Sequence, residues 1–228
     1  MTSDGMVDFD LVPSLMSKCE KQLLYEIAKA TDGDAVEVGS WMGGSTIIIA
    51  SGLKNGKVYA IDPHKDTTSH RAGKVEDTFR IFKKNIRNFG VDNKIIPVRK
   101  TSKEAFDSWE GRKVGMLFID GDHSYGGVRY DIESWTRFLK SNGFLVFHDL
   151  FGGGHDGVRK AVLDTGIVDK MRYLKRKDRL AVFVNDGKTK LKGRLTVRYV
   201  SGIKRFFWYI TQAMRPRVWK KHILKINV

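Results

Sequence analysis

Acidic and imidazole side chains recur at the carboxyl ends of four short apolar segments of the chain. Glu37 lies within the first segment, Asp62 follows the second, Asp120-Gly-Asp-His123 follows the third, and His148-Asp149 follow the fourth. The packing of apolar strands does not require acids at these points. Ligands of parallel sheets, in contrast, bind beyond the carboxyl ends of the strands. We therefore expect these side chains to meet in one site.

A glycine-rich turn follows the first apolar segment and indicates which ligand the site takes. A dinucleotide site needs the spacing G-x-G-x-x-G and a helix N-terminus that faces a pyrophosphate. Here three residues separate Gly39 from Gly43, and Glu37 precedes both. A carboxylate there would repel a pyrophosphate but suits the ammonium group of a methionine moiety. Asp62 is spaced to accept hydrogen bonds from two ribose hydroxyls. The pattern favours S-adenosylmethionine (SAM) over NAD.

The last two strand ends offer ligands for a cation. Asp120, Asp149 and the adjoining His148 come from neighbouring strands, as one divalent ion would require. A hard cation and a nearby base are the two devices that turn a hydroxyl of high pKa into a nucleophile. Two plainer interpretations stay open. In the first, Asp120–His123 is only a turn, in which acids occur because they favour turns. In the second, His148 is a hydrogen-bonded structural residue and not a ligand.

The elements that must position these residues alternate along the chain. Strands are predicted at 35–38, 57–61, 94–98, 114–119, 143–147 and 180–184. Helices are predicted after a capping box at Ser17–Glu20, at 45–53, at 79–89, after a second capping box at Thr101–Glu104, at 126–139 and at 158–163. Because the strands are nearly all apolar and alternate with helices, we expect a doubly wound α/β fold with a mostly parallel sheet.

The net charge of +15 is concentrated in the last forty or so residues. Residues 187–228 hold 12 Lys and Arg and no acid, which leaves 29 basic against 26 acidic residues in 1–186. We therefore predict a catalytic domain over 1–186 and a basic amphipathic tail over 187–228. The tail is predicted either to contact an anionic membrane surface, to pack on the body or on a second copy in a homo-oligomer, or to bind nucleic acid.

Four stretches carry a family resemblance: VEVGSWMGGST, VYAIDPH, FIDGDHSYGGVRYDIESW and GFLVFHD. They resemble class I SAM-dependent methyltransferases of the methyltransferase 24 group, which includes macrocin O-methyltransferase. More distantly they resemble catechol O-methyltransferase. The resemblance covers about residues 17–186 and implies a seven-stranded, Rossmann-like sheet.

The resemblance also implies roles for single residues. The cofactor would be bound by five of them: Glu37 at its amino group, Gly39 beneath it, Ser45 at its carboxylate, Asp62 at its ribose and Ser102 at its adenine. For Ser45 and Ser102, simple helix capping is the alternative.

The same resemblance implies the catalytic centre. Asp120 and Asp149 would hold a divalent metal, Mg²⁺ in the relatives, and His123 would be the general base beside Asp120. His148 stands where the relatives carry a carboxylate, and imidazole favours metals softer than Mg²⁺. The acceptor implied is a hydroxyl of a sugar, a glycolipid or a related small molecule.

Two other functions compete with this one: a nucleic-acid methyltransferase that uses the basic tail, and a non-catalytic SAM-binding scaffold. Nucleic acid is disfavoured because the chain lacks the Asn/Asp-Pro-Pro-Tyr signature of amino-methylating DNA enzymes. A single cysteine, Cys19, and an N-terminus without a basic, apolar start predict a cytoplasmic protein, with peripheral contact to the inner membrane as a further possibility.

Overall fold

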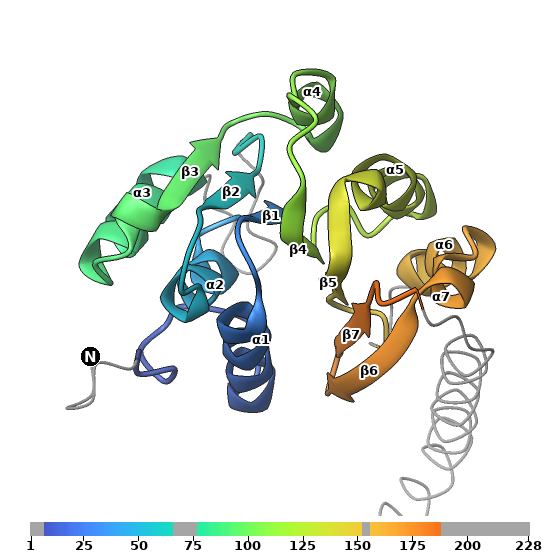
Figure 1. Ribbon diagram of the computed structural model, residues 1–228. Coiled ribbons are helices and arrows are strands. Elements are labelled where there is room, and N and C mark those ends of the chain that lie inside the picture. The colour runs from blue at the N-terminus through green and yellow to red at the C-terminus, as the bar shows by residue number, and fades with distance from the viewer. Residues whose placement is uncertain (1–6, 66–76, 152–155, 188–228) are drawn as a thin grey trace, which may run out of the picture.

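The computed structural model describes residues 7–65, 77–151 and 156–187 of the chain. Within these ranges a sheet of seven strands lies between two layers of helices (Figure 1). The strands are β1 (Ala35–Val38), β2 (Val58–Ile61), β3 (Ile95–Val98), β4 (Val114–Ile119), β5 (Leu139–Phe147), β6 (Arg172–Lys177) and β7 (Leu180–Val184). The helices are α1 (Lys18–Ala30), α2 (Gly44–Gly52), α3 (Thr78–Asn88), α4 (Ser102–Asp107), α5 (Tyr125–Trp135), α6 (Asp156–Asp164) and α7 (Ile167–Lys170).

The strand order is β3-β2-β1-β4-β5-β7-β6. The five strands β1 to β5 run parallel to one another, whereas β7 is antiparallel to both of its neighbours, β5 and β6. The prediction of a doubly wound, mostly parallel sheet is confirmed. Because β1, β2 and β3 extend to one side and β4 and β5 to the other, the order reverses between β1 and β4. A ligand of such a sheet binds at this reversal.

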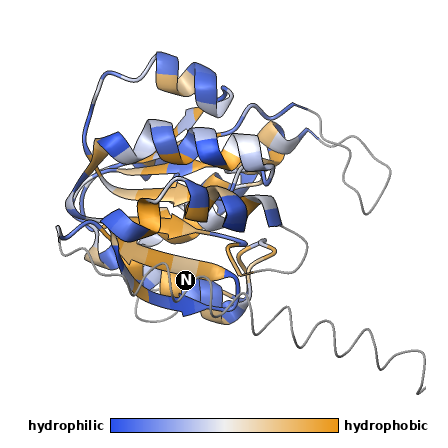
Figure 2. Cartoon of the chain, turned by 90° about the vertical axis from the view of Figure 1, so that its right-hand side faces the viewer, coloured by the Kyte–Doolittle hydropathy of each residue, from blue (hydrophilic) through white to orange (hydrophobic). Residues whose placement is uncertain are grey.

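Alternate residues of each strand face opposite helix layers, so the sheet has two apolar cores. Helices α1, α2 and α3 cover one face, where Leu24, Ile48 and Phe82 are buried against the sheet. Helices α4 to α7 cover the other, where Trp135 is 1% exposed. Figure 2 shows the apolar strands between helices of mixed hydropathy. Both faces of the central strands β1, β2 and β4 are therefore buried, which leaves the strand ends as the place for polar chemistry.

Two helices begin where the sequence predicts. Ser17 and Glu20 form a reciprocal capping box at the start of α1, and Thr101 and Glu104 form another at the start of α4. Other boundaries differ from the prediction. Helix α5 ends at Trp135, and β5 begins at Leu139 instead of at residue 143, with a shift of register against β4.

Strand β6 was missed because its sequence, Arg-Tyr-Leu-Lys-Arg-Lys, lacks apolar alternation. It lies at the edge of the sheet, where only one neighbour supplies hydrogen bonds and most of its side chains stay partly or fully exposed.

Candidate active site

A cavity of about 770 Å³ lies over the carboxyl ends of the parallel strands. Nine residues were predicted to form the site, and eight of them line this cavity: Gly39, Ser45, Asp62, Ser102, Asp120, His123, His148 and Asp149. The ninth, Glu37, is fully buried and does not line the cavity. Backbone hydrogen bonds fix the strand ends side by side, from Gly39 to Ile61 and from Asp120 to Val38. The topology therefore gathers residues that are more than a hundred positions apart.

The backbone of the turn after β1 packs directly against the backbone at the start of the loop after β4. Gly39 has φ +92°, and a Cβ built there would lie 2.2 Å from the carbonyl oxygen of Asp120. Only glycine meets both conditions. This contact closes the floor of the cavity at the point where the strand order reverses.

Beside this turn, within the described part of the chain, two buried polar atoms lack a hydrogen bond of ordinary geometry. Oε2 of Glu37 accepts a hydrogen bond from Thr46 at 2.5 Å. Its Oε1 and the hydroxyl of Ser40 are buried and unpaired among the residues that the structure describes. A buried polar atom without a hydrogen bond costs free energy, and a bound ligand that supplies the hydrogen bond removes this cost. Burial raises the pKa of Glu37 to about 8, an effect that the hydroxyls of Ser45 and Thr46 only partly offset.

Asp62 lies at the end of β2 and accepts two backbone hydrogen bonds. Its Oδ2 takes the N–H of Trp41 and its Oδ1 the N–H of His64, each at 2.8 Å. A carboxylate has about four acceptor positions, so the same oxygens still have room for two hydroxyl donors. Asp62 also fixes the backbone of Trp41, which has a left-handed φ of 41°.

The capping alternative for the two serines is wrong. The N-cap of α2 is Gly43, and that of α4 is Thr101. Ser102 instead donates its hydroxyl proton to Asp131 and accepts a hydrogen bond from the Trp135 indole at 2.9 Å.

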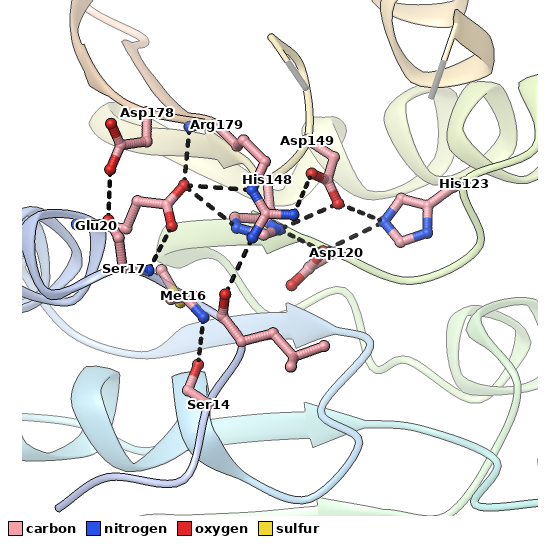
Figure 3. A network of polar contacts seen from close by, with 11 residues as sticks. Ser14, Met16, Ser17, Glu20, Asp120, His123, His148, Asp149, Asp178 and Arg179 are labelled. Atoms are coloured by element: carbon pink, nitrogen blue, oxygen red, sulfur yellow. Dashed lines mark hydrogen bonds and ion pairs between the residues drawn. The ribbon is translucent and has the colours of Figure 1, made fainter. Parts of the chain in front are cut away.

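Asp120, His123, His148 and Asp149 form a compact cluster at the other end of the cavity (Figure 3). Nδ1 of His148 lies 3.2 Å from Asp120 Oδ1 and 3.4 Å from Asp149 Oδ2. Nε2 of His123 lies 3.5 Å and 3.3 Å from the same two oxygens. Two imidazoles thus face the same pair of carboxylate oxygens. Asp149 is held there in a left-handed backbone conformation, with φ 56°.

The cluster shifts the protonation of its members. Hydrogen bonds to Asp120 and Asp149 raise the pKa of His123 to about 9. Burial disfavours the charged form of His148, but its hydrogen bonds to three carboxylates prevail and raise its pKa to about 11. Burial likewise opposes ionisation of Asp149, yet the two imidazoles hold the pKa of that carboxyl well below its usual range.

The donor atoms also fit a shared cation. Asp120, His123 and Asp149 each offer one ligand atom, all within 4.8 Å of one another. Ligand atoms bound at about 2.1 Å to one ion are separated by roughly 3.0 to 3.4 Å, depending on the geometry. The separations of 3.2–3.5 Å between the carboxylate oxygens and the imidazole nitrogens are close to that range. The set includes His123, which the sequence predicted as a base and not as a ligand.

The structure adds three polar residues that sequence reasoning missed. Asp131 lines the cavity beside Ser102, and burial raises its pKa to about 6. An acid on the apolar stripe of α5, between Val128 and Ile132, was the available signal. Glu20 was interpreted only as part of a capping box, and Arg179 was not singled out from the sequence. Both contact the cluster (Figure 3).

The structure also shows the surroundings of two further polar residues near the cavity, Asp122 and His64. Asp122 accepts hydrogen bonds from the backbone and hydroxyl of Ser124, which supports the turn interpretation for that one acid. Loop histidines are usually solvated, but His64, in the loop after β2, is buried, with Nδ1 3.2 Å from the Thr78 hydroxyl. His70 and Arg71 lie outside the described residues.

A family-wide model described as a methyltransferase domain matches residues 36–150, which span β1 to the end of β5. An uncharacterized protein of Acanthamoeba polyphaga mimivirus is 29% identical over 118 residues, half of each chain. An uncharacterized protein of Sinorhizobium fredii is 40% identical over 52 residues, which is 23% of this chain and 6% of that one. The chain thus matches about half the length of the first relative and a small part of the second.

Solved structures share the fold at low sequence identity. The O-methyltransferase from Bacillus cereus in complex with SAH matches with a TM-score of 0.59 and 14% identity, over 77% of this chain and 84% of that one. The O-methyltransferase TomG from Streptomyces achromogenes, in complex with SAM, matches with a TM-score of 0.59 and 15% identity, over 78% and 85%. These likenesses concern the fold.

Proposed function

Because the chain belongs to the methyltransferase domain family, we propose that it is a SAM-dependent enzyme that transfers the methyl group of SAM to a hydroxyl oxygen. The observation that carries this proposal is the single cavity with two chemically distinct ends. One end is lined by Asp62 and Ser40, and the buried Glu37 lies directly before the lining residues Val38 and Gly39. The other end offers His123 between two carboxylates. A cofactor held at the first end would present its sulfonium to an acceptor at the second.

The residues fit the cofactor in their chemistry. Glu37, once ionised, would pair with the ammonium group of the methionine moiety, and Ser45 would hold the carboxylate. Asp62 would accept the ribose hydroxyls, while Ser102 and Asp131 would lie at the adenine. Gly39 would form the floor beneath the cofactor, where any side chain would clash with the backbone of Asp120.

Methyl transfer to oxygen needs in-line geometry and removal of the hydroxyl proton. His123 is half-buried, lines the cavity, and is the residue we propose as the general base. Its Nε2 would take the proton while Asp120 and Asp149 stabilise the resulting imidazolium. Those carboxylates also favour the imidazolium before reaction, and the base must start neutral.

We propose that a divalent metal assists, held by Asp120, Asp149 and His148. Bound there, the ion would lower the pKa of the acceptor hydroxyl and offset the charge that favours protonated His123. The imidazole of His148 makes Mn²⁺ or Zn²⁺ a realistic alternative to Mg²⁺. Chelation with EDTA should then abolish transfer, and Mg²⁺, Mn²⁺ and Zn²⁺ should be compared for rescue. Full turnover in chelator would contradict the metal but not the transfer.

The acceptor is proposed to be a sugar, a glycolipid or a related small molecule. The direct test is incubation of the protein with methyl-labelled SAM and a cell extract, followed by identification of the labelled product. We expect a methyl ether on a small molecule or a glycolipid. A labelled nucleic acid would instead favour the competing methyltransferase function, and SAM binding without any labelled product would favour the non-catalytic scaffold.

The cellular location remains a proposal as well. Across the described residues, every helix is too short or too polar to cross a bilayer. The basic tail, residues 187–228, lies almost wholly outside the described residues. We propose that it provides peripheral contact with an anionic membrane surface, which would suit a lipid-linked acceptor.

A further inference from the structure

The segment before α1 forms one wall of the active-site cavity. Pro13, Ser14, Leu15 and Met16 all line it. At one side this segment packs on the turn that leads into α2. A Cβ built at Gly44 would lie 2.4 Å from the carbonyl oxygen of Pro13 and 2.8 Å from Ser14. The wall therefore touches the cofactor half of the cavity directly.

A single guanidinium holds the other side of this wall. Arg179 lies in the turn between β6 and β7, and its Nη2 donates to the carbonyl oxygen of Leu15 at 3.0 Å. Its Nη1 donates to Oδ1 of Asp149, also at 3.0 Å. Figure 3 shows the guanidinium between the wall and the acid centre. One side chain thus connects the wall of the cavity to a member of the catalytic cluster.

The backbone of Arg179 is itself fixed by Glu20. Oε1 of Glu20 accepts the Arg179 N–H at 2.8 Å and lies 3.5 Å from Nε2 of His148. Its Oε2 accepts the N–H of Ser17 at 2.7 Å, within the capping box of α1. The side chain of Glu20 is 1% exposed, so these contacts are shielded from water. The turn, the start of α1 and the end of β5 therefore meet on one buried carboxylate.

We propose that Arg179 is a positioning residue that couples the wall segment, residues 13–16, to Asp149, so that the wall and the acid centre are fixed as one unit. The proposal deepens the proposed function, because it takes Asp149 as part of the reacting end of the cavity. Arginine is required because its planar fork reaches two acceptors at once, whereas a lysine ammonium supplies one flexible point charge. Loss of the guanidinium would remove the hydrogen bond to Leu15, so the wall segment would move more freely. Because Pro13 and Ser14 pack on Gly44, the cofactor half of the cavity would become less ordered as well.

The test compares Arg179→Gln and Arg179→Lys with Lys177→Gln, a charge-removing control at an exposed position of the same hairpin. Hydrogen exchange measures the wall, and calorimetry measures the affinity for S-adenosylhomocysteine (SAH), the demethylated cofactor. For Arg179→Gln we expect exchange of the amides of residues 14–16 to rise at least tenfold, while α5 keeps its protection. SAH affinity should fall about tenfold. Arg179→Lys should restore neither value fully, and Lys177→Gln should match the wild type.

Three results would overturn the proposal: unchanged exchange at residues 14–16, a uniform rise in exchange through the whole chain, or full restoration by lysine. A uniform rise would mark Arg179 as a general stabilising residue. The exchange readout needs neither cofactor nor turnover. A wild-type protein that binds no SAH would therefore contradict the proposed function, while the exchange data would still decide the role of Arg179.

Discussion

Glu37 is the cofactor-site residue whose chemistry its surroundings change most. It is fully buried, and burial raises its pKa to about 8. In the unfolded chain the group is ionised above its ordinary pKa of 4.5. The folded state therefore binds one more proton than the unfolded state between pH 4.5 and about 8. The contribution of Glu37 to stability therefore falls as pH rises through this window, by up to about 1.4 kcal/mol per pH unit.

The variant Glu37→Gln removes this titration with almost no change of shape. Compared with the wild type, its free energy of unfolding should decline less between pH 5 and pH 8, by an amount on the order of a few kcal/mol. Urea unfolding at each pH measures the difference. A wild-type-to-variant difference that stays constant with pH would show that the Glu37 carboxyl is not held protonated in the folded protein.

The raised pKa of Glu37 also predicts how the affinity for SAH depends on pH. If the ammonium of SAH pairs with ionised Glu37, binding releases a proton, and the affinity of the wild type should rise from pH 6 to pH 8. Glu37→Gln should bind SAH more weakly than the wild type at pH 8 and about equally at pH 6. Calorimetry in buffers of different ionisation heat measures the proton release directly. Equal pH profiles for the two proteins would remove Glu37 as the ammonium partner.

His123 carries the proposed base chemistry. The variant His123→Ala should keep its SAH affinity, because the residue lies at the opposite end of the cavity from Asp62 and Glu37. Methyl transfer should fall by about 10² to 10⁴, the usual contribution of general base catalysis. Single-turnover assays with labelled SAM and the acceptor identified from extract provide the measurement. Transfer within a factor of two of the wild type would exclude His123 as the base.

At the scale of elements, the site depends on how closely the turn after β1 approaches the loop after β4. The variant Gly39→Ala should lose about 1–3 kcal/mol of stability and its SAH binding, because its Cβ would meet Asp120 and φ is +92°. Gly126→Ala in α5 is the matched control, since a Cβ there meets nothing within 4 Å. It should be neutral or stabilising by up to about 1 kcal/mol. Equal effects of the two substitutions on unfolding would contradict the close approach.

The predictable part of the structure is the part that local sequence determines. Capping boxes depend on residues three apart, and parallel strands are mostly short apolar runs, so α1, α4 and the approximate positions of β1 to β5 could be predicted from sequence. Eight of the nine residues predicted for the site line the cavity; strand ends indicated most of them, and the family resemblance added Ser45 and Ser102. Polar edge strand β6 could not be found this way. Neither could the contact of Glu20 with Arg179, since it joins residues 159 positions apart.

At the scale of the whole molecule, residues 1–186 carry an almost balanced charge and residues 187–228 a strongly basic one. The full-length protein should therefore bind vesicles that contain anionic lipid, bind neutral vesicles weakly, and detach as salt rises. Cosedimentation measures this. The chain truncated after Asp186 should lose vesicle binding but keep its affinity for SAH. Equal vesicle binding by the truncated chain would contradict the membrane role of the tail.

The central claim is that one cavity of this sheet binds SAM through the ends of β1 and β2. Calorimetric titration of the purified full-length protein with SAH tests it most directly, with Asp62→Ala as the comparison. We predict one site per chain for the wild type and an affinity at least tenfold weaker for the variant. Asp62→Ala would remove both the proposed acceptor of the ribose hydroxyls and the hydrogen bond that holds the backbone of Trp41. A folded wild-type protein that gives no heat of binding, or binding that Asp62→Ala leaves unchanged, would contradict the account.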